Sequence, residues 1–145
     1  MQTTISIDAS VAIKLIVEEQ GSSKARVIVE SYDLIFVPAH AHAHAEVAEI
    51  VLRKLYAGLV DERQAVLVLE KLPEILRPVA LDTILLDAFR ITKTIRHSVY
   101  DCLYIATARK LNVALVTADL RMLRKTAGSE FSSIVFNLES FTPPP

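Results

Sequence analysis

Four acidic residues stand at positions where their side chains can act together. Asp8 follows the apolar segment "TTISI", and Asp119 closely follows "NVALVT". Glu46 and Asp101 lie in the helical patterns "AEVAEIVLRKL" and "SVYDCLYIATARKL". Crowded carboxylates repel one another unless a divalent cation neutralises them, and a cage of oxygens suits Mg²⁺ or Mn²⁺. Because water bound to such an ion attacks phosphodiesters, the pattern predicts metal-dependent hydrolysis. It also predicts that, without metal, repulsion raises the pKa of at least one carboxyl.

Each acid also has a simpler explanation when it is taken singly. Asp8 or Ser10 can cap the helix that follows the first apolar segment, and Asp119 can cap the helix that follows it. The stretch "SVYD" has the form of a capping box, and Glu46 can be a solvated helix residue. These explanations stay open for each residue, but no structural role requires all four acids together.

Three histidines alternate with alanines in "AHAHAHAEVAEIV", directly before Glu46. The alanines and the apolar spacing favour a helix, on which His40 and His44 share the buried face while His42 points away from it, close to Glu46. Histidines that diverge around a helix cannot hold one ion together. A zinc site at the pair four residues apart stays open, but the sequence favours histidines that pack in the core or in a subunit contact.

The two glutamates of this helix have different surroundings. Glu46 lies at the edge of the apolar face, where a partly hydrated carboxylate requires a cation or a hydrogen-bond donor. Glu49 lies away from that face and four residues before Arg53, a spacing typical of an exposed ion pair. Glu46 is therefore the candidate for the site.

Composition limits the class of protein. The chain has 145 residues, 52% of them hydrophobic, and a mean hydropathy of +0.36, which predicts a sheet covered on both faces, an apolar subunit interface, or both. We expect one domain over residues 1–141 and a flexible Pro-rich tail over 142–145. No apolar run is long enough to span a membrane, the N-terminal segment has no signal-peptide pattern, and the single Cys102 excludes an internal disulfide. We therefore expect a cytoplasmic protein without membrane contact.

The net charge of −1 means that nucleic-acid binding requires a local basic patch.

Strand and helix patterns alternate along the chain. The expected strands are 3–7, 33–38, 74–81, 112–117 and 133–138. The expected helices are 10–18, 22–31, 39–57, 61–72, 82–95, 98–111 and 120–126. This alternation predicts an α/β fold with a parallel β-sheet flanked by helices on both faces. Ligands of such sheets bind outside the carboxyl ends of the strands, where Asp8 and Asp119 stand.

Four stretches, in this order and spacing, resemble the PIN domain: "IDASVAIKL", "AEVAEIVLRKL", "SVYDCLYIATARKL" and "LVTADLRML". More narrowly, they are similar to the VapC-type toxins of prokaryotic toxin–antitoxin pairs, over nearly the whole chain. The most specific part is "YDxxYxAxA" followed by "LVTxD". The resemblance implies a three-layer PIN-like fold, and by position the family's acids map onto Asp8, Glu46, Asp101 and Asp119. Ser10 and Thr117 match its supporting hydroxyls, whereas the histidine run departs from the apolar and small residues that are usual there.

The same resemblance implies an activity and partners. It implies an endoribonuclease that depends on Mg²⁺ or Mn²⁺, cleaves RNA phosphodiesters, forms a homodimer and is held by a VapB-like antitoxin. Two alternatives stay open: a PIN-type RNA-processing nuclease without an antitoxin, and a catalytically idle PIN domain that serves as a binding module. The intact set of four acids argues against the idle module.

Basic residues near the acids are candidates for RNA contacts. Arg121, Arg124 and Lys125 follow Asp119 directly, and Lys14 stands within two turns of Asp8. Two more basic residues, Lys93 and Arg96, precede the helix that carries Asp101. Such side chains can orient an RNA strand through its phosphates without reading its sequence, although a solvated helix face explains any one of them equally well.

Overall fold

A five-stranded parallel sheet forms the centre of the computed structural model, which describes residues 2–145 but not the side chains of His40 and Ala41. The strand order is β3-β2-β1-β4-β5, and every neighbouring pair is parallel. The strands are β1 (Thr4–Ile7), β2 (Leu34–Pro38), β3 (Arg77–Val79), β4 (Leu115–Thr117) and β5 (Val135–Asn137).

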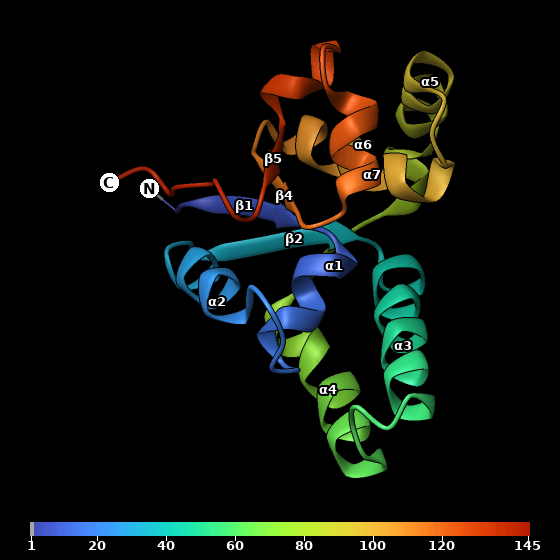
Figure 1. The fold of residues 1–145 in the computed structure, drawn as a ribbon. Helices are drawn as coiled ribbons and strands as arrows, with labels where there is room; N and C mark the ends of the chain where they lie inside the picture. Colours follow the sequence, from blue (N-terminus) through green and yellow to red (C-terminus); the bar gives the residue numbers. More distant parts are fainter. Residues whose placement is uncertain (1) are drawn as a thin grey trace.

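Helices cover both faces of this sheet. They are α1 (Ala9–Ala12), α2 (Ser22–Glu30), α3 (His40–Tyr56), α4 (Glu62–Ile75), α5 (Leu85–Ile95), α6 (Val99–Leu111) and α7 (Leu120–Thr126). Figure 1 shows α1 to α4 on one side of the sheet and α5, α6 and α7 on the other. The arrangement has three layers and confirms the predicted α/β class. Within the described residues, no helix combines the length and the apolar character that a membrane crossing requires.

The middle of the sheet explains the high hydropathy of the chain. Ile5, Ser6 and Ile7 of β1 have no exposed surface, and β4 is buried at every residue. Helix α6 packs against this part of the sheet, and all of its residues from Cys102 to Ala108 are buried. Strands that are covered on both faces are largely apolar, so the sheet and α6 form the centre of the core, to which the buried faces of the other helices add.

Several element boundaries differ from the sequence prediction; β4 and α5, for example, each begin three residues later than predicted. Helix α1 ends at Ala12 and continues only as a 3₁₀ turn over Ile13–Leu15, whereas a helix to residue 18 was expected. Helix α4 runs through Pro73 to Ile75, because a proline near the end of a helix removes only one of its hydrogen bonds. Strand β3 therefore begins at Arg77 rather than at residue 74. It is an edge strand that pairs with β2 at three positions, which is where a strand tolerates Pro78.

The order of the strands predicts a ligand crevice at one edge of the sheet. From β1 the chain passes to β2 and β3 on one side, and β4 and β5 lie on the other side of β1. The strand order therefore reverses between β1 and β4, and ligands of open parallel sheets bind at such a point, beyond the carboxyl ends of the strands. Asp8 directly follows β1, and Asp119 stands two residues after β4.

Candidate active site

Asp8 directly follows β1 and is buried, with 4% of its surface exposed. Its Oδ1 accepts hydrogen bonds from the backbone N–H of Val11 at 3.2 Å and from Oγ of Ser10 at 2.5 Å. Its Oδ2 accepts a hydrogen bond from the hydroxyl of Thr117, the last residue of β4. Asp8 therefore caps α1, as the simpler explanation predicts, and it also joins β1 to β4.

Two hydroxyls fix the loop that follows β4. Oγ of Ser10 accepts a hydrogen bond from the backbone N–H of Ala118 at 3.0 Å, and Oγ1 of Thr117 accepts one from the backbone N–H of Asp119 at 2.9 Å. Each hydroxyl thus donates to Asp8 and accepts from the loop. The two side chains hold the carboxyls of Asp8 and Asp119 at a set separation.

Asp119 caps α7 with one of its two carboxylate oxygens. Oδ1 accepts hydrogen bonds from the backbone N–H groups of Arg121 at 2.9 Å and Met122 at 3.4 Å. Within the described part of the chain, Oδ2 has no hydrogen-bond donor. The cap thus orients the side chain and leaves one oxygen available to a ligand.

Glu46 is held by a helix from the other side of the sheet. The hydroxyl of Tyr104, on α6, donates a 2.9 Å hydrogen bond to Oε2 of Glu46, on α3. Nε2 of His42 lies 3.1 Å from Oε1 of Glu46, although its geometry is not that of a directed hydrogen bond. Both carboxylate oxygens of Glu46 therefore have a protein neighbour.

The expected outward direction of His42 is wrong, because this side chain is buried. Its ring stacks on that of Tyr100, with centroids 5.7 Å apart and planes 12° apart, and lies 5.3 Å from the ring of Tyr104. The apolar pattern of α3 marks the face that packs on its own side of the sheet, whereas α6 covers a second face near the start of the helix. His44 is half-buried, and the side chain of His40 lies outside the described residues, so a zinc site at that pair stays untested.

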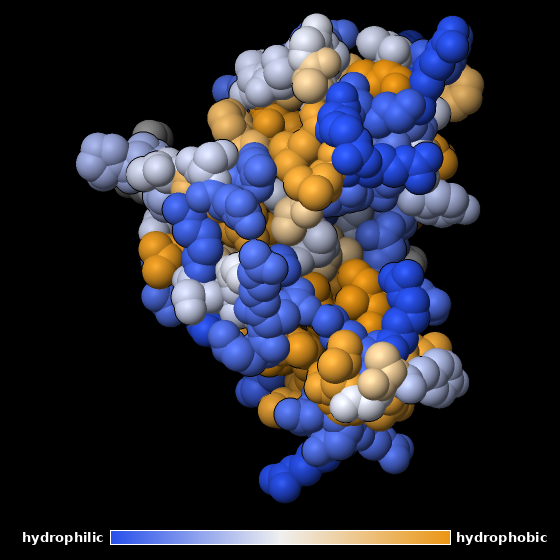
Figure 2. Space-filling model, in the orientation of Figure 1, coloured by the Kyte–Doolittle hydropathy of each residue, from blue (hydrophilic) through white to orange (hydrophobic). Residues whose placement is uncertain are grey.

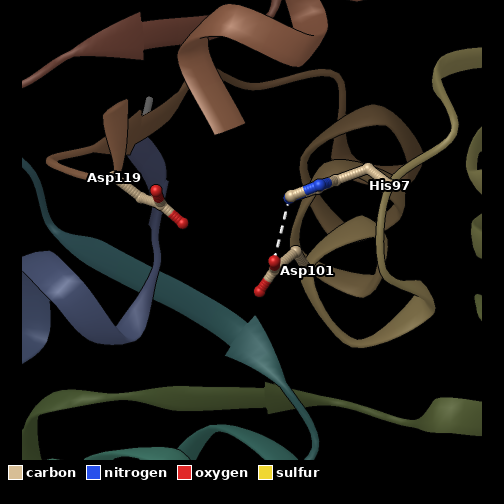
Figure 3. A group of neighbouring side chains, drawn as sticks. All are labelled: His97, Asp101 and Asp119. Atoms are coloured by element: carbon tan, nitrogen blue, oxygen red, sulfur yellow. Dashed lines mark ion pairs between the residues drawn. The ribbon is translucent and has the colours of Figure 1, made fainter. Parts of the chain in front are cut away.

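Asp101 has a histidine neighbour that the sequence analysis does not single out. Nε2 of His97 lies 2.8 Å from Oδ2 of Asp101. One ligand atom each from His97, Asp101 and Asp119 lie within 4.8 Å of one another (Figure 3). The signal available in the sequence is the spacing of four residues between His97 and Asp101. That spacing alone does not distinguish a site residue from a surface histidine.

The pKa shifts of Asp8 and Asp101 have burial as their main cause and neighbouring acids as a smaller one. Burial raises the pKa of Asp8 to about 6, although hydrogen bonds from Ser10, Thr117 and Val11 lower it, and the charge of Asp119 adds to the rise. Burial also raises the pKa of Asp101, and the charges of Glu46 and Asp119 raise it further. His97 and His42 lower it in part. The predicted rise is therefore present, but its main cause is burial and not the repulsion that the sequence predicts.

Tyr104 lies beside three of the acids. Burial raises the pKa of its hydroxyl well above the ordinary range, and the charges of Glu46, Asp8 and Asp101 contribute to the rise. The group is therefore a neutral hydrogen-bond donor at physiological pH. The sequence contains this tyrosine in "YDxxYxAxA", but nothing in the spacing indicates its contact with Glu46.

Glu49 stands apart from the site. It is exposed on α3, and its placement away from the apolar face is confirmed. Its expected ion pair with Arg53 is wrong, because none joins these two side chains in the described part of the chain. An exposed ion pair contributes little to stability, so the helix is stable with or without a contact between Glu49 and Arg53.

The basic candidates have two kinds of surroundings. Arg121, Arg124 and Lys125 are exposed on α7, and among the described side chains none of them forms an ion pair. Nζ of Lys14, by contrast, lies 3.0 Å from Oε1 of Glu19 and donates a 2.8 Å hydrogen bond to the carbonyl of Gln20. The α7 side chains are available to a ligand, whereas that of Lys14 is already engaged.

The donor set of the crevice fits a divalent cation. One carboxylate oxygen each of Asp101 and Asp119 lies close to one imidazole nitrogen, that of His97. Burial first, and neighbouring acids second, raise the pKa of Asp8 and Asp101, so the site opposes its own ionisation. A cation offsets that opposition directly. Asp101 and Asp119, with an oxygen each toward the crevice, are placed to hold such an ion, and Asp8 and Glu46 lie beside them.

Comparisons with known proteins identify the family of the chain. The family model for the PIN domain matches residues 5–128. The chain is 30% identical over 123 residues to the protein named Ribonuclease VapC3 of Pyrobaculum aerophilum, covering 82% of this chain and 92% of that protein. The structure is also similar to two crystal structures. For PAE2754 from P. aerophilum the TM-score is 0.66 at 22% identity, over 95% of this chain and 85% of that one. For FitAcB from Neisseria gonorrhoeae it is 0.60 at 17% identity, over 94% and 99%. With the family model matched over most of its length, the chain belongs to the PIN domain family, and within it resembles the VapC-type ribonucleases.

Proposed function

We propose that this protein is an endoribonuclease that depends on Mg²⁺ or Mn²⁺ and cleaves RNA phosphodiesters. Its active site consists of Asp8, Glu46, Asp101 and Asp119. The observation that carries the proposal is the convergence of these carboxylates, from four separate segments, at the reversal point of the sheet. The similarity to a protein named as a ribonuclease supports the choice of RNA as substrate. The exposed basic side chains of α7 lie next to Asp119 and supply contacts to RNA phosphates.

Each residue of the crevice has a distinct task in this proposal. A divalent cation, when bound, lowers the pKa of water and offsets the negative charge that develops on a phosphodiester. Asp101 and Asp119 hold the cation, and Asp8, whose two oxygens are fixed by three donors, adds negative charge at a set position. Glu46, oriented by Tyr104 and His42, is available to align a water or a ligand.

We further propose that the protein is the toxin of a VapBC-type pair, inhibited by a VapB-like antitoxin, and that it forms a homodimer. A toxin–antitoxin complex from Klebsiella pneumoniae has a similar fold, with a TM-score of 0.59 at 14% identity. Large apolar side chains are exposed on α4 and α5: Val66, Leu67, Leu69, Leu85, Leu86 and Phe89. Figure 2 shows such a surface over the lower helices, around α3 and α4. Light scattering after gel filtration tests the dimer, which a monomer at high protein concentration would contradict.

The activity is tested by incubating the purified protein with structured RNAs and with Mg²⁺, Mn²⁺ or EDTA. We expect cleavage with either metal, none in EDTA, and none with the Asp8→Asn variant purified in parallel, which controls for contaminating nucleases. If RNA remains intact in both metals, the protein is an idle binding module. A small open reading frame just upstream, whose product suppresses the cleavage, separates the toxin from an RNA-processing nuclease without an antitoxin.

A further inference from the structure

We propose that His97 is a direct nitrogen ligand of the cation that Asp101 and Asp119 hold, and that it makes the site prefer Mn²⁺ over Mg²⁺. The inference rests on the proposed metal-dependent function and extends it, because the site then contains an imidazole as well as carboxylates. Figure 3 shows the ring of His97 directed from one side into the space that Asp101 and Asp119 face from two others.

The surroundings of His97 are those of a side chain that lacks a partner. Its side chain is only 1% exposed, and in the described part of the chain neither ring nitrogen makes a hydrogen bond. Among the described residues its ion-pair neighbour is Asp101, with Oδ2 at 2.8 Å, and the geometry of that contact is not that of a directed hydrogen bond. Leaving a buried polar group unsatisfied costs about 1–3 kcal/mol, so such a group requires an explanation.

The distances fit a shared ion. Two ligands at right angles on an ion, each with a bond of about 2.1 Å, lie about 3 Å apart, and two opposite ligands lie about 4.2 Å apart. The separation between Nε2 of His97 and Oδ2 of Asp101 is 2.8 Å, and all three ligand atoms of the group lie within 4.8 Å of one another. One nitrogen and two oxygens can therefore contact one cation with small adjustments.

The backbone holds His97 in this position. The preceding residue, Arg96, ends α5 in the left-handed conformation, with φ of 53°, and the following residue, Ser98, caps α6 through the backbone N–H of Tyr100. A non-glycine residue rarely adopts this φ, and such conformations persist where the surrounding structure requires them. His97 is thus confined between the end of one helix and the start of the next.

An imidazole ligand changes the choice of metal. Mg²⁺ prefers oxygen ligands throughout, whereas nitrogen ligands bind transition ions more strongly, and the affinity for Mn²⁺ rises accordingly. Removing His97 should weaken Mn²⁺ binding more than Mg²⁺ binding. A purely structural histidine would instead change the melting temperature and leave the ratio of the two affinities as it was.

The test measures Mn²⁺ binding to the purified full chain without RNA. We expect the pulsed EPR spectrum of bound Mn²⁺ to show coupling to a ¹⁴N nucleus, replaced by ¹⁵N coupling in protein labelled with ¹⁵N-histidine. In His97→Gln we expect that coupling to vanish and calorimetry to show a Kd for Mn²⁺ raised about tenfold or more, with a smaller rise for Mg²⁺. His44→Gln, a histidine outside the group of three, is the matched control and should keep the signal.

The outcomes separate this inference from the proposed function. Stoichiometric Mn²⁺ binding and RNA cleavage without nitrogen coupling would overturn the role of His97 and leave the nuclease intact. Coupling that is lost in His42→Gln but kept in His97→Gln would also overturn it. A protein that neither binds Mn²⁺ nor cleaves RNA would contradict the proposed function itself. If His97→Gln does not fold, the labelled wild type still tests for a histidine ligand. His40→Gln, His42→Gln and His44→Gln then identify it by elimination, since the chain has four histidines.

Discussion

The hydroxyl of Tyr104 on α6 donates a hydrogen bond to Oε2 of Glu46 on α3, across 58 residues of sequence and 2.9 Å of space. The tyrosine is 1% exposed, so its ring is fixed by the core while its hydroxyl fixes the glutamate. Tyr104→Phe keeps the ring and removes the donor. Because a hydrogen bond to a charged group contributes about 1.5–3 kcal/mol, we expect RNA cleavage to fall about 10-fold or more, with little change in RNA affinity. An unchanged kcat in a folded Tyr104→Phe protein would show that Glu46 needs no such support.

The four acids should each be essential for cleavage. Asp8→Asn, Glu46→Gln, Asp101→Asn and Asp119→Asn remove a charge with little change of shape, and we expect each to reduce the cleavage rate by a factor on the order of 10² or more. Glu49→Gln, on an exposed part of the same helix as Glu46, is the matched control and should cleave at the wild-type rate. Loss of cleavage in the Glu49 variant and its survival in the Glu46 variant would contradict the geometry of α3.

Much of the fold follows from local sequence patterns. The alternation of apolar strands with helices predicts the parallel sheet, and each of its strands is found within a predicted segment. The errors occur where tertiary contacts override the pattern. The pairing of β3 with β2 shortens the predicted strand, and α6 buries His42 on a face of α3 that its own apolar spacing marks as outward.

The candidate site is only partly visible in the sequence. Residues at strand ends, such as Asp8 and Asp119, are predictable because the carboxyl ends of parallel strands share one edge. The side chains of Tyr104 and His97 are not, because each lies near an acid only after α6 has packed on the sheet opposite to α3 and the α5–α6 connection has brought His97 to Asp101. The main cause of the raised pKa of Asp8 is likewise its burial, which depends on the whole fold.

The exposed basic side chains of α7 should contribute to RNA affinity without sequence preference. We expect Arg121→Ala and Arg124→Ala to weaken binding of several RNAs by similar factors, and each to reduce the slope of log K against log salt by about 0.7. The cleavage rate at saturating RNA should change little. Fluorescence anisotropy at several salt concentrations measures both effects, with Arg63→Ala on α4 as the control. Equal salt slopes in all three variants would show that α7 does not contact phosphates.

Asp8 should make the metal-free protein less stable as pH rises. Its pKa in the folded state is about 6 against an ordinary value of 3.8, so between these values the folded state binds more protons than the unfolded state. The free energy of unfolding therefore falls with rising pH across that window, by about 3 kcal/mol in total, and is level above it. Asp8→Asn removes this contribution. Urea denaturation in EDTA measures the free energy of unfolding at both ends of this pH window. Between them, Asp8→Asn should lose less stability than the wild type. If the wild type instead gains stability relative to Asp8→Asn across it, the carboxyl is stabilised as an anion and needs no cation.

Metal should restore the stability that these carboxyls remove. A cation that binds only the folded state adds RT ln(1 + [L]/Kd), about 2.7 kcal/mol at a hundredfold excess over Kd, which raises the melting temperature by about 5–10 °C for a chain of this length. The rise in melting temperature should be largest near neutral pH. It should shrink below about pH 5, because protons then occupy the carboxyls of Asp8 and Asp101, whose pKa is raised. Asp101→Asn should melt above the wild type in EDTA, because it removes a half-buried charge that neighbouring acids repel, yet gain less from Mn²⁺, because it removes a ligand. Thermal melts of both proteins with EDTA and with saturating Mn²⁺ measure this. A wild-type melting temperature that ignores Mn²⁺, or an Asp101→Asn protein that melts below the wild type in EDTA, would mean that these acids act only as helix caps and surface charges.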